Sequence, residues 1–285
     1  MTKPHLCYPD ISPVAVGGLG GSGTRLIAQH LKDTGFYIGS LLNEANDNLL
    51  FTLLFKRTTI LSISDADFDA LIDIFVKSMT GETDFTPQQL QLAEHLAAQY
   101  ANPQIKAWLS AHGNPLLYQV HRHKPDNPWG WKEPNTHITL DRLITRFPKL
   151  KYVHVMRNGL DVAYSSNQRQ LKLWGKHFLG ESVAPTPYYA LKFWCIIHQR
   201  VLAMAESNPG QFMLLNYDNL CAYPEQEIDK LLGFLSIEPS SAVTKQLAKS
   251  VQPPTSIGRF RRHDLGQFAE EDIAFVQFLG FDVRV

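Results

Sequence analysis

The residues near the start of the chain that are most suited to chemistry are closely spaced glycines around a serine and a threonine. They follow the apolar residues 14–16, precede an apolar pattern with helical spacing, and are Gly17, Gly18, Gly20, Gly21 and Gly23. Glycine permits positive φ and a close approach of a ligand to the backbone. Free N–H groups and the dipole at the start of the next helix favour an anion. Residues 17–26, here called the glycine loop, are therefore predicted to bind phosphate through Gly20, Gly21, Ser22, Gly23, Thr24 and Arg25.

Two familiar nucleotide-binding motifs compete for these glycines. Gly18, Gly20 and Gly23 fit the dinucleotide fingerprint G-x-G-x-x-G, which makes an NAD-dependent oxidoreductase an alternative function. In that case Glu44 would be the acid that binds the ribose. Gly18 and Gly23 also begin the pattern G-x-x-x-x-G-K-[ST], but Thr24 occupies the position of its lysine. The missing lysine argues against an ordinary ATP- or GTP-hydrolysing enzyme.

A second candidate for anion binding lies in the middle of the chain. Arg157 follows residues 151–156, which are predicted to form a strand, and Ser165 lies eight residues later in the expected next helix. Arginine makes forked, charge-assisted hydrogen bonds to phosphate, and serine adds a hydroxyl. Together with the N–H groups at the helix start, these side chains are suited to hold one phosphate.

The composition limits the class of protein. The 285 residues are 44% apolar and carry no formal net charge, which gives no electrostatic basis for binding nucleic acid or a membrane surface. No apolar run is long enough to span a bilayer, and residues 1–13 lack the apolar segment of a signal peptide. The three cysteines have no metal-ligand spacing. We expect a cytoplasmic globular protein with reduced thiols and without a metal site.

The order of the predicted elements indicates an α/β fold. Strands are expected at residues 14–16, 35–39, 116–120, 151–156 and 211–215, and helices at residues 136–147, from 158 onward, 187–207, 224–235 and 240–250. Alternation of strands and helices predicts a mostly parallel, doubly wound sheet flanked by helices. Ligands gather at the carboxyl ends of such strands, where the glycine loop, Lys132, Arg157 and Asn216 are all expected.

Residues 65–111 have a different character, with helical patterns throughout. Residues 65–79 place apolar side chains on one face, and Thr86 with Pro87 is typical of the start of a helix. We predict one α/β domain over residues 1–285, in which residues 41–115 are a mostly helical insert. The insert is expected either to be scaffold or to lie near an acceptor molecule.

The motif around Arg157 resembles that of the sulfotransferases that use 3′-phosphoadenosine 5′-phosphosulfate (PAPS). Their 3′-phosphate motif is R-N-P-x-D-V-A-x-S, and here Gly159 replaces the proline. Four further segments are similar to the family and occur in the same order: residues 21–26 to its 5′-phosphosulfate loop, 131–134 to its lysine segment, 214–220 to its R-Y-E-D-L strand end, and 256–262 to its C-terminal basic loop. The resemblance implies a P-loop-like fold.

The resemblance also implies roles for individual residues. Arg157 and Ser165 would hold the 3′-phosphate, Tyr217 would lie near the adenine, and Arg259 and Arg261 would close over the nucleotide. Lys132 would contact the transferring sulfuryl group. Gly21 departs from the family, which usually has Lys or Arg at that position. We hypothesise that Arg25, in the first turn of the helix, supplies the missing positive charge.

The resemblance implies a PAPS-dependent sulfotransferase that needs no metal. In-line transfer to a hydroxyl or amine requires a base, and Glu44 is the first candidate, before Glu133 and then His121, His123 and His137. The acceptor would be a carbohydrate, lipid or other small metabolite, or a peptide, and the sequence does not define the oligomeric state. Besides the oxidoreductase, a non-catalytic protein that binds adenosine 3′,5′-bisphosphate (PAP) remains an alternative because of Gly21.

Overall fold

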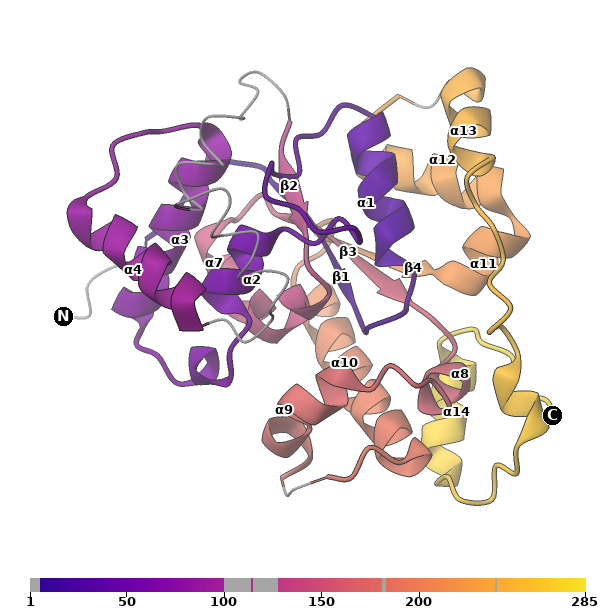
Figure 1. Ribbon diagram of the computed structural model, residues 1–285. Coiled ribbons are helices and arrows are strands. Elements are labelled where there is room, and N and C mark those ends of the chain that lie inside the picture. Colours follow the sequence, from indigo (N-terminus) through magenta and orange to yellow (C-terminus); the bar gives the residue numbers. More distant parts are fainter. Residues whose placement is uncertain (1–5, 100–113, 115–127, 181–182, 239) are drawn as a thin grey trace. The chain divides into compact units, whose positions relative to one another are not determined.

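The computed structural model describes residues 6–99, 114, 128–180, 183–238 and 240–285 (Figure 1). The chain divides into two compact units. The first comprises Met1–Val16 and Ile27–Leu150, and the second comprises Gly17–Leu26 and Lys151–Val285. Strand β1 (Val14–Gly18) and helix α1 (Thr24–Asp33) each contribute residues to both units. The glycine loop therefore belongs to the same unit as Arg157, whereas Lys132 belongs to the other.

The strands form a sheet in the order β2-β1-β3-β4, with β2 at Gly130–Lys132, β3 at Lys151–Met156 and β4 at Phe212–Asn216. Strand β1 pairs with β2 in parallel, from Val14 opposite Gly130 to Val16 opposite Lys132. Strand β3 pairs with β4 in parallel, from Tyr152 opposite Phe212 to Met156 opposite Asn216. Buried apolar side chains fill β1 and β3, as expected for strands covered on both faces. The parallel sheet flanked by helices confirms the predicted α/β fold class.

The first unit is mainly helical outside its strands. Its described helices, besides α1, are α2 (Leu49–Phe55), the 3₁₀-helix η1 (Thr58–Leu61), α3 (Asp65–Thr80), α4 (Pro87–Gln99), the 3₁₀-helix η2 (Pro134–Thr139) and α7 (Leu140–Arg146). Helix α3 begins where the Ser64 hydroxyl accepts a hydrogen bond from the Asp67 N–H, and it ends at Gly81 in the left-handed conformation. The rings of Phe51, Phe75 and Trp131 pack together in the core of the first unit.

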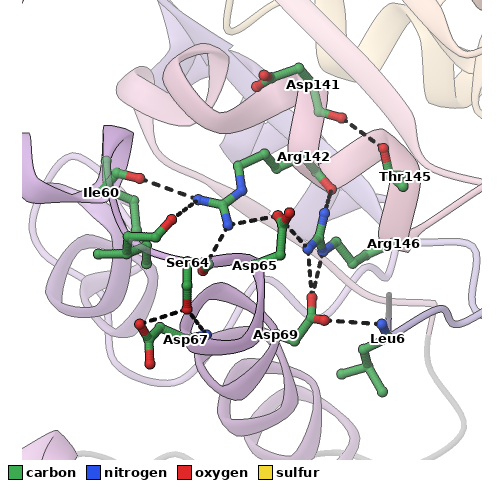
Figure 2. Close-up of polar contacts among 11 residues, drawn as sticks. Leu6, Ile60, Ser64, Asp65, Asp67, Asp69, Asp141, Arg142, Thr145 and Arg146 are labelled. Carbon is green, nitrogen blue, oxygen red and sulfur yellow. Dashed lines mark hydrogen bonds and ion pairs between the residues drawn. The ribbon is translucent and has the colours of Figure 1, made fainter. Parts of the chain in front are cut away.

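Ion pairs connect α3 to α7, as Figure 2 shows. The Arg146 side chain is 2% exposed and lies 2.7 Å from the Asp69 carboxylate and 3.1 Å from the Asp65 carboxylate. Asp69 also accepts a hydrogen bond from the Leu6 N–H at 3.1 Å. Arg142 donates to the Ser64 carbonyl and pairs with Asp65. The buried Arg146 guanidinium thus depends on these carboxylates for its compensation.

We expect Asp69→Asn to lower the free energy of unfolding by about 3 kcal/mol, because it weakens the compensation of a buried charge. Urea denaturation of the whole chain measures this effect. Asp141→Asn is the matched control, because Asp141 is an exposed carboxylate in the first turn of α7 and should contribute at most about 1 kcal/mol. Equal losses of unfolding free energy in Asp69→Asn and Asp141→Asn would contradict the stabilising role given to the ion pair between Arg146 and Asp69.

The second unit contains the remaining helices. They are α8 (Gly159–Ala163), α9 (Arg169–Leu179), α10 (Pro187–Ser207), α11 (Tyr217–Ala222), α12 (Pro224–Phe234), α13 (Ser241–Ala248), η3 (Arg259–Arg262) and α14 (Glu270–Phe278). Helix α10 packs against α8, α9 and α14. The buried Trp194 of α10 donates from its ring nitrogen to the Arg157 carbonyl at 3.1 Å. The carboxyl end of β3, which carries Arg157, is therefore anchored on α10.

Several sequence expectations need correction. Within the part of the chain that the structure describes, residues 35–39 form no strand and make a single bridge, between Tyr37 and Trp129. The helix expected at residues 136–147 begins as the 3₁₀-helix η2, and α2 was not predicted. Helix α8 ends at Ala163, so Ser165 lies after the helix and not inside it. The strand expected at residues 116–120 lies outside the described residues, and the single-domain organisation with its insert stays a prediction.

Candidate active site

The glycine loop presents several unbonded backbone donors. Gly18, Gly21 and Gly23 have φ values of 152°, 89° and 95°, which side-chain-bearing residues rarely adopt. The Ser22 N–H donates to the Leu19 carbonyl at 3.1 Å and so closes the turn. Within the part of the chain that the structure describes, the N–H groups of Gly21, Gly23, Thr24 and Arg25 make no backbone hydrogen bond. This is the arrangement expected of an anion site at a helix start.

Arg157 adds a buried cation to this loop. It directly follows β3 and is only 8% exposed, and its Nη1 donates to the Gly21 carbonyl at 3.3 Å. Its Nε and Nη2 are buried and have no hydrogen-bond partner among the described residues. The Ser22 hydroxyl, 1% exposed, is unsatisfied in the same sense. Because unsatisfied buried donors are costly, these atoms indicate a site for an anionic ligand.

Tyr217 and Asp218, at the start of α11, complete the surroundings of Arg157. The Tyr217 ring packs on Gly23 so closely that a Cβ at position 23 would lie 2.2 Å from a ring carbon. The Arg157 guanidinium lies 6.0 Å from the centre of the same ring. The Asp218 carboxylate lies 4.0 Å from Arg157 Nε. Burial raises the pKa of Asp218 to about 6 despite the opposing effect of Arg157, and Asp161 contributes to the increase.

Ser165 lies in a segment that packs against the glycine loop. Its hydroxyl accepts a hydrogen bond from the Asn167 N–H at 3.2 Å. The Asn167 amide covers Gly20, where a Cβ would lie 3.0 Å from the amide nitrogen. Gln170 donates to the Gly18 carbonyl at 3.1 Å. The sequence reasoning missed Asn167 and Gln170, which no motif marks and which only their contacts with the loop reveal.

The C-terminal basic loop is fixed to α8 by Asp161. Its buried carboxylate accepts hydrogen bonds from the Gly258 N–H at 2.8 Å and the Phe260 N–H at 3.1 Å. Arg259 donates to the Tyr164 carbonyl at 3.3 Å, next to Ser165. Arg261 is half-exposed and pairs with Asp282 at 2.7 Å. Asp161 therefore binds the basic loop, and Arg157 does not depend on it for an ion pair.

Lys132 belongs to the first unit and is almost fully buried there. It ends β2 opposite Val16, and its ammonium donates to the Ala45 carbonyl at 3.1 Å and forms an ion pair with Asp47. Only 2% of Lys132 is exposed. It is therefore not a solvated surface lysine, and the loop at residues 42–48 supplies its partners.

The carboxylates considered as bases differ in their surroundings. Glu44 is exposed and makes no hydrogen bond or ion pair within the described residues. Glu133 is fully buried, pairs with Lys56 at 3.1 Å and accepts hydrogen bonds from the N–H and side-chain amide of Asn135. These contacts favour a structural role for Glu133. His137 is buried, whereas His121 and His123 lie outside the described residues.

The described residues contain neither a metal-binding cluster nor a membrane-spanning helix. Their histidine, cysteine and acidic side chains form no group of three or more that is suited to hold a metal ion. None of the helices described combines the length and the apolar character that crossing a bilayer requires.

Comparison with known proteins decides the family. The model of the sulfotransferase family matches residues 13–241, which include both the glycine loop and the motif around Arg157. The chain belongs to the sulfotransferase family. The recognition made from the sequence motifs is therefore confirmed, and transfer of a sulfuryl group is the enzymatic reaction that membership supports. No curated protein matches the chain significantly in sequence.

Solved structures of sulfotransferases have a similar fold. The sulfotransferase domain of the Synechococcus PCC 7002 olefin synthase has a TM-score of 0.54 and 16% identity, and the match covers 99% of this chain and 98% of that domain. The sulfotransferase STF9 from Mycobacterium avium has a TM-score of 0.50 and 15% identity, with 98% and 79% of the two chains covered. At such low identity these similarities concern the fold alone.

Proposed function

We propose that this family member transfers a sulfuryl group from PAPS to a hydroxyl or amine of a small-molecule or glycan acceptor. The observation that carries the proposal is the buried Arg157, two of whose nitrogens make no hydrogen bond among the described residues, beside a loop whose N–H groups make no backbone hydrogen bond there. A dinucleotide fingerprint alone does not account for this arginine. PAPS carries anionic groups on both its 3′ and 5′ sides, and the second unit offers donors for both.

The donor contacts follow from the positions of these groups. Arg157 and Ser165 would bind the 3′-phosphate, with Arg259 and Arg261 closing over it, and the Tyr217 ring would lie against the adenine. The N–H groups of the glycine loop and the Ser22 and Thr24 hydroxyls would bind the 5′-phosphosulfate. Gly21 contributes no side chain, so we assign its missing charge to Arg25, which is exposed on the first turn of α1. A cationic side chain on the first turn, such as that of Arg25, can contact an anion bound at the start of the helix.

The reaction is an in-line displacement at sulfur. The acceptor oxygen forms a bond to sulfur while the bond from sulfur to the 5′-phosphate oxygen breaks, so PAP leaves with that oxygen. The acceptor proton passes to a base, for which we propose Glu44, because its carboxylate is exposed and makes no hydrogen bond or ion pair with a described residue, while that of Glu133 is occupied. Lys132 would stabilise the charge on the equatorial oxygens. Val16, which lies opposite Lys132 in the pairing of β1 with β2, directly precedes the glycine loop in the sequence.

The acceptor class depends on residues outside the donor site. We propose that residues 41–115 determine it, since they follow the glycine loop and contain the candidate base. A carbohydrate, a lipid or another small metabolite is compatible with the family reaction.

Calorimetric titration with PAP, beside NADH as a control, tests the proposed donor. Binding of PAP but not NADH is expected, and it justifies screening acceptors with radiolabelled PAPS. Binding of NADH without PAP would replace the proposal with the oxidoreductase alternative. Binding of PAP without turnover on a broad acceptor panel would instead favour a non-catalytic nucleotide-binding protein.

Asp218 is expected to make PAP binding depend on pH. Its pKa of about 6 means that its carboxylate is charged above that pH, where it repels a phosphate bound by Arg157, and is neutral below it. We expect Asp218→Asn to bind PAP about tenfold more tightly than the natural chain at about pH 8 and equally well at about pH 5. The phosphate itself titrates near pH 6 in both proteins, so the ratio of the two dissociation constants isolates Asp218. A ratio independent of pH would contradict this role.

A further inference from the structure

We propose that Asp47 is the positioning residue of Lys132 and fixes the direction of its ammonium, an inference that rests on the proposed function of this lysine in sulfuryl transfer. No family motif marks Asp47. The proposal comes from the ion pair between the two side chains and from the loop that holds the carboxylate in place.

The carboxylate of Asp47 is held by its own loop. The Asn43 side-chain carbonyl accepts hydrogen bonds from the Ala45 N–H and the Asp47 N–H, both at 2.9 Å. The Asn43 amide nitrogen then donates to Asp47 Oδ2 at 2.8 Å, which leaves Oδ1 for Lys132. A bridge between Leu42 and Asn48 closes the loop. Contacts within the loop therefore hold Asp47 in place independently of its ion pair with Lys132.

The loop leaves Lys132 one donor. An ammonium has three N–H groups; one is directed at the Ala45 carbonyl and one at Asp47. With two directions fixed by the same loop, the third N–H has a defined direction and makes no hydrogen bond with the residues that the structure describes, so it would be available for a sulfuryl oxygen. The carboxylate also compensates a lysine that is only 2% exposed and would otherwise be a costly buried charge. Preorganisation of this kind stabilises a transition state without reorganisation during the reaction.

This arrangement separates Asp47 from the proposed base. Glu44 lies in the same loop, but its side chain is exposed and forms no hydrogen bond or ion pair with Lys132. If a residue acts through Lys132, its replacement no longer changes kcat once the lysine has been replaced. Replacement of a base still lowers kcat in that background. A double-mutant cycle distinguishes the two cases.

The test compares the natural chain with Asp47→Asn, Lys132→Met and the double variant, using radiolabelled PAPS and the acceptor panel. Asp47→Asn should lower kcat about 30-fold and leave the PAP dissociation constant within about twofold, since PAP has no sulfuryl group. In the Lys132→Met background, Asp47→Asn should change kcat less than about twofold. Asp47→Glu should restore part of the activity, and Asp33→Asn, an exposed carboxylate on α1, should retain full activity.

An equal loss of kcat from Asp47→Asn in both backgrounds would overturn the proposal, as would full activity of the single variant. The double variant removes both charges, so it leaves no uncompensated charge in the buried pair, and the thermal midpoint of each protein identifies a variant that has only lost stability. If the natural chain neither binds PAP nor turns over PAPS, the proposed function fails. If the natural chain turns over PAPS and Asp47→Asn does so equally well, only the role of Asp47 fails.

Discussion

Arg157→Ala is expected to weaken PAP binding about 100- to 1,000-fold, which corresponds to about 3–4 kcal/mol. Two buried nitrogens of Arg157 make no hydrogen bond in the described part of the chain, and a phosphate would satisfy both through charge-assisted hydrogen bonds worth about 1.5–3 kcal/mol each. Titration calorimetry on the purified full chain measures the loss. Arg157→Lys should recover only part of the affinity, because an ammonium lacks the planar fork of the guanidinium.

The matched control is Arg262→Ala, because Arg262 is an exposed arginine of the basic loop and has no hydrogen-bond or ion-pair partner among the described residues. It should leave PAP affinity within about threefold. Removal of Arg157 leaves Asp218 without its nearby cation, so the double variant Arg157→Ala/Asp218→Asn checks that the loss concerns the ligand. If PAP binds the folded Arg157 variants as tightly as the natural chain, the 3′-phosphate lies elsewhere.

Lys132→Met is expected to lower kcat about 1,000-fold while PAP affinity stays within about threefold. The ammonium would act on the sulfuryl group, which PAP lacks, so its removal affects the transition state and not product binding. Turnover of PAPS with the acceptor panel measures kcat, and calorimetry measures PAP affinity. Methionine keeps the length of the buried side chain, which limits the loss of packing.

Lys132→Met leaves the Asp47 carboxylate without its cation, and this unpaired charge could destabilise the fold. The combination Lys132→Met/Asp47→Asn removes both charges and should recover stability while keeping the low kcat of Lys132→Met. A parallel loss of PAP affinity and kcat would contradict the role given to Lys132, because it would place the lysine at the nucleotide and not at the sulfuryl group.

Strong local patterns account for the parts of the fold that the sequence predicted well. Strand β3 and helix α10 have the predicted ends, because one is a short run of buried residues and the other is a long amphipathic helix with Thr186 and Pro187 at its start. Residues 35–39 have a similar apolar pattern, yet among the described residues they make a single bridge, between Tyr37 and Trp129. Short apolar runs carry too little periodicity to distinguish a strand from a buried loop. Helix α2 was missed because it is buried throughout and shows no polar face.

The candidate site was predictable where one segment carries the whole signal. The glycine loop and Arg157 could be selected from their own motifs, and the structure brings them into contact. Asp47 and Asn167 could not be selected in this way, and the motif that contains both Arg157 and Asp161 does not mark the contact of Asp161 with the basic loop. These residues contact residues distant in sequence, such as Lys132 for Asp47 and Gly258 for Asp161. Only the folded chain reveals these partners.

Comparison of PAP with adenosine 5′-monophosphate in calorimetric titrations tests the central claim most directly, because the two ligands differ only in the 3′-phosphate. A site built around Arg157 predicts that PAP binds at least about 100-fold more tightly than the monophosphate. Equal affinities for the two nucleotides, or no binding of PAP, would contradict the assignment of this site to a PAPS donor.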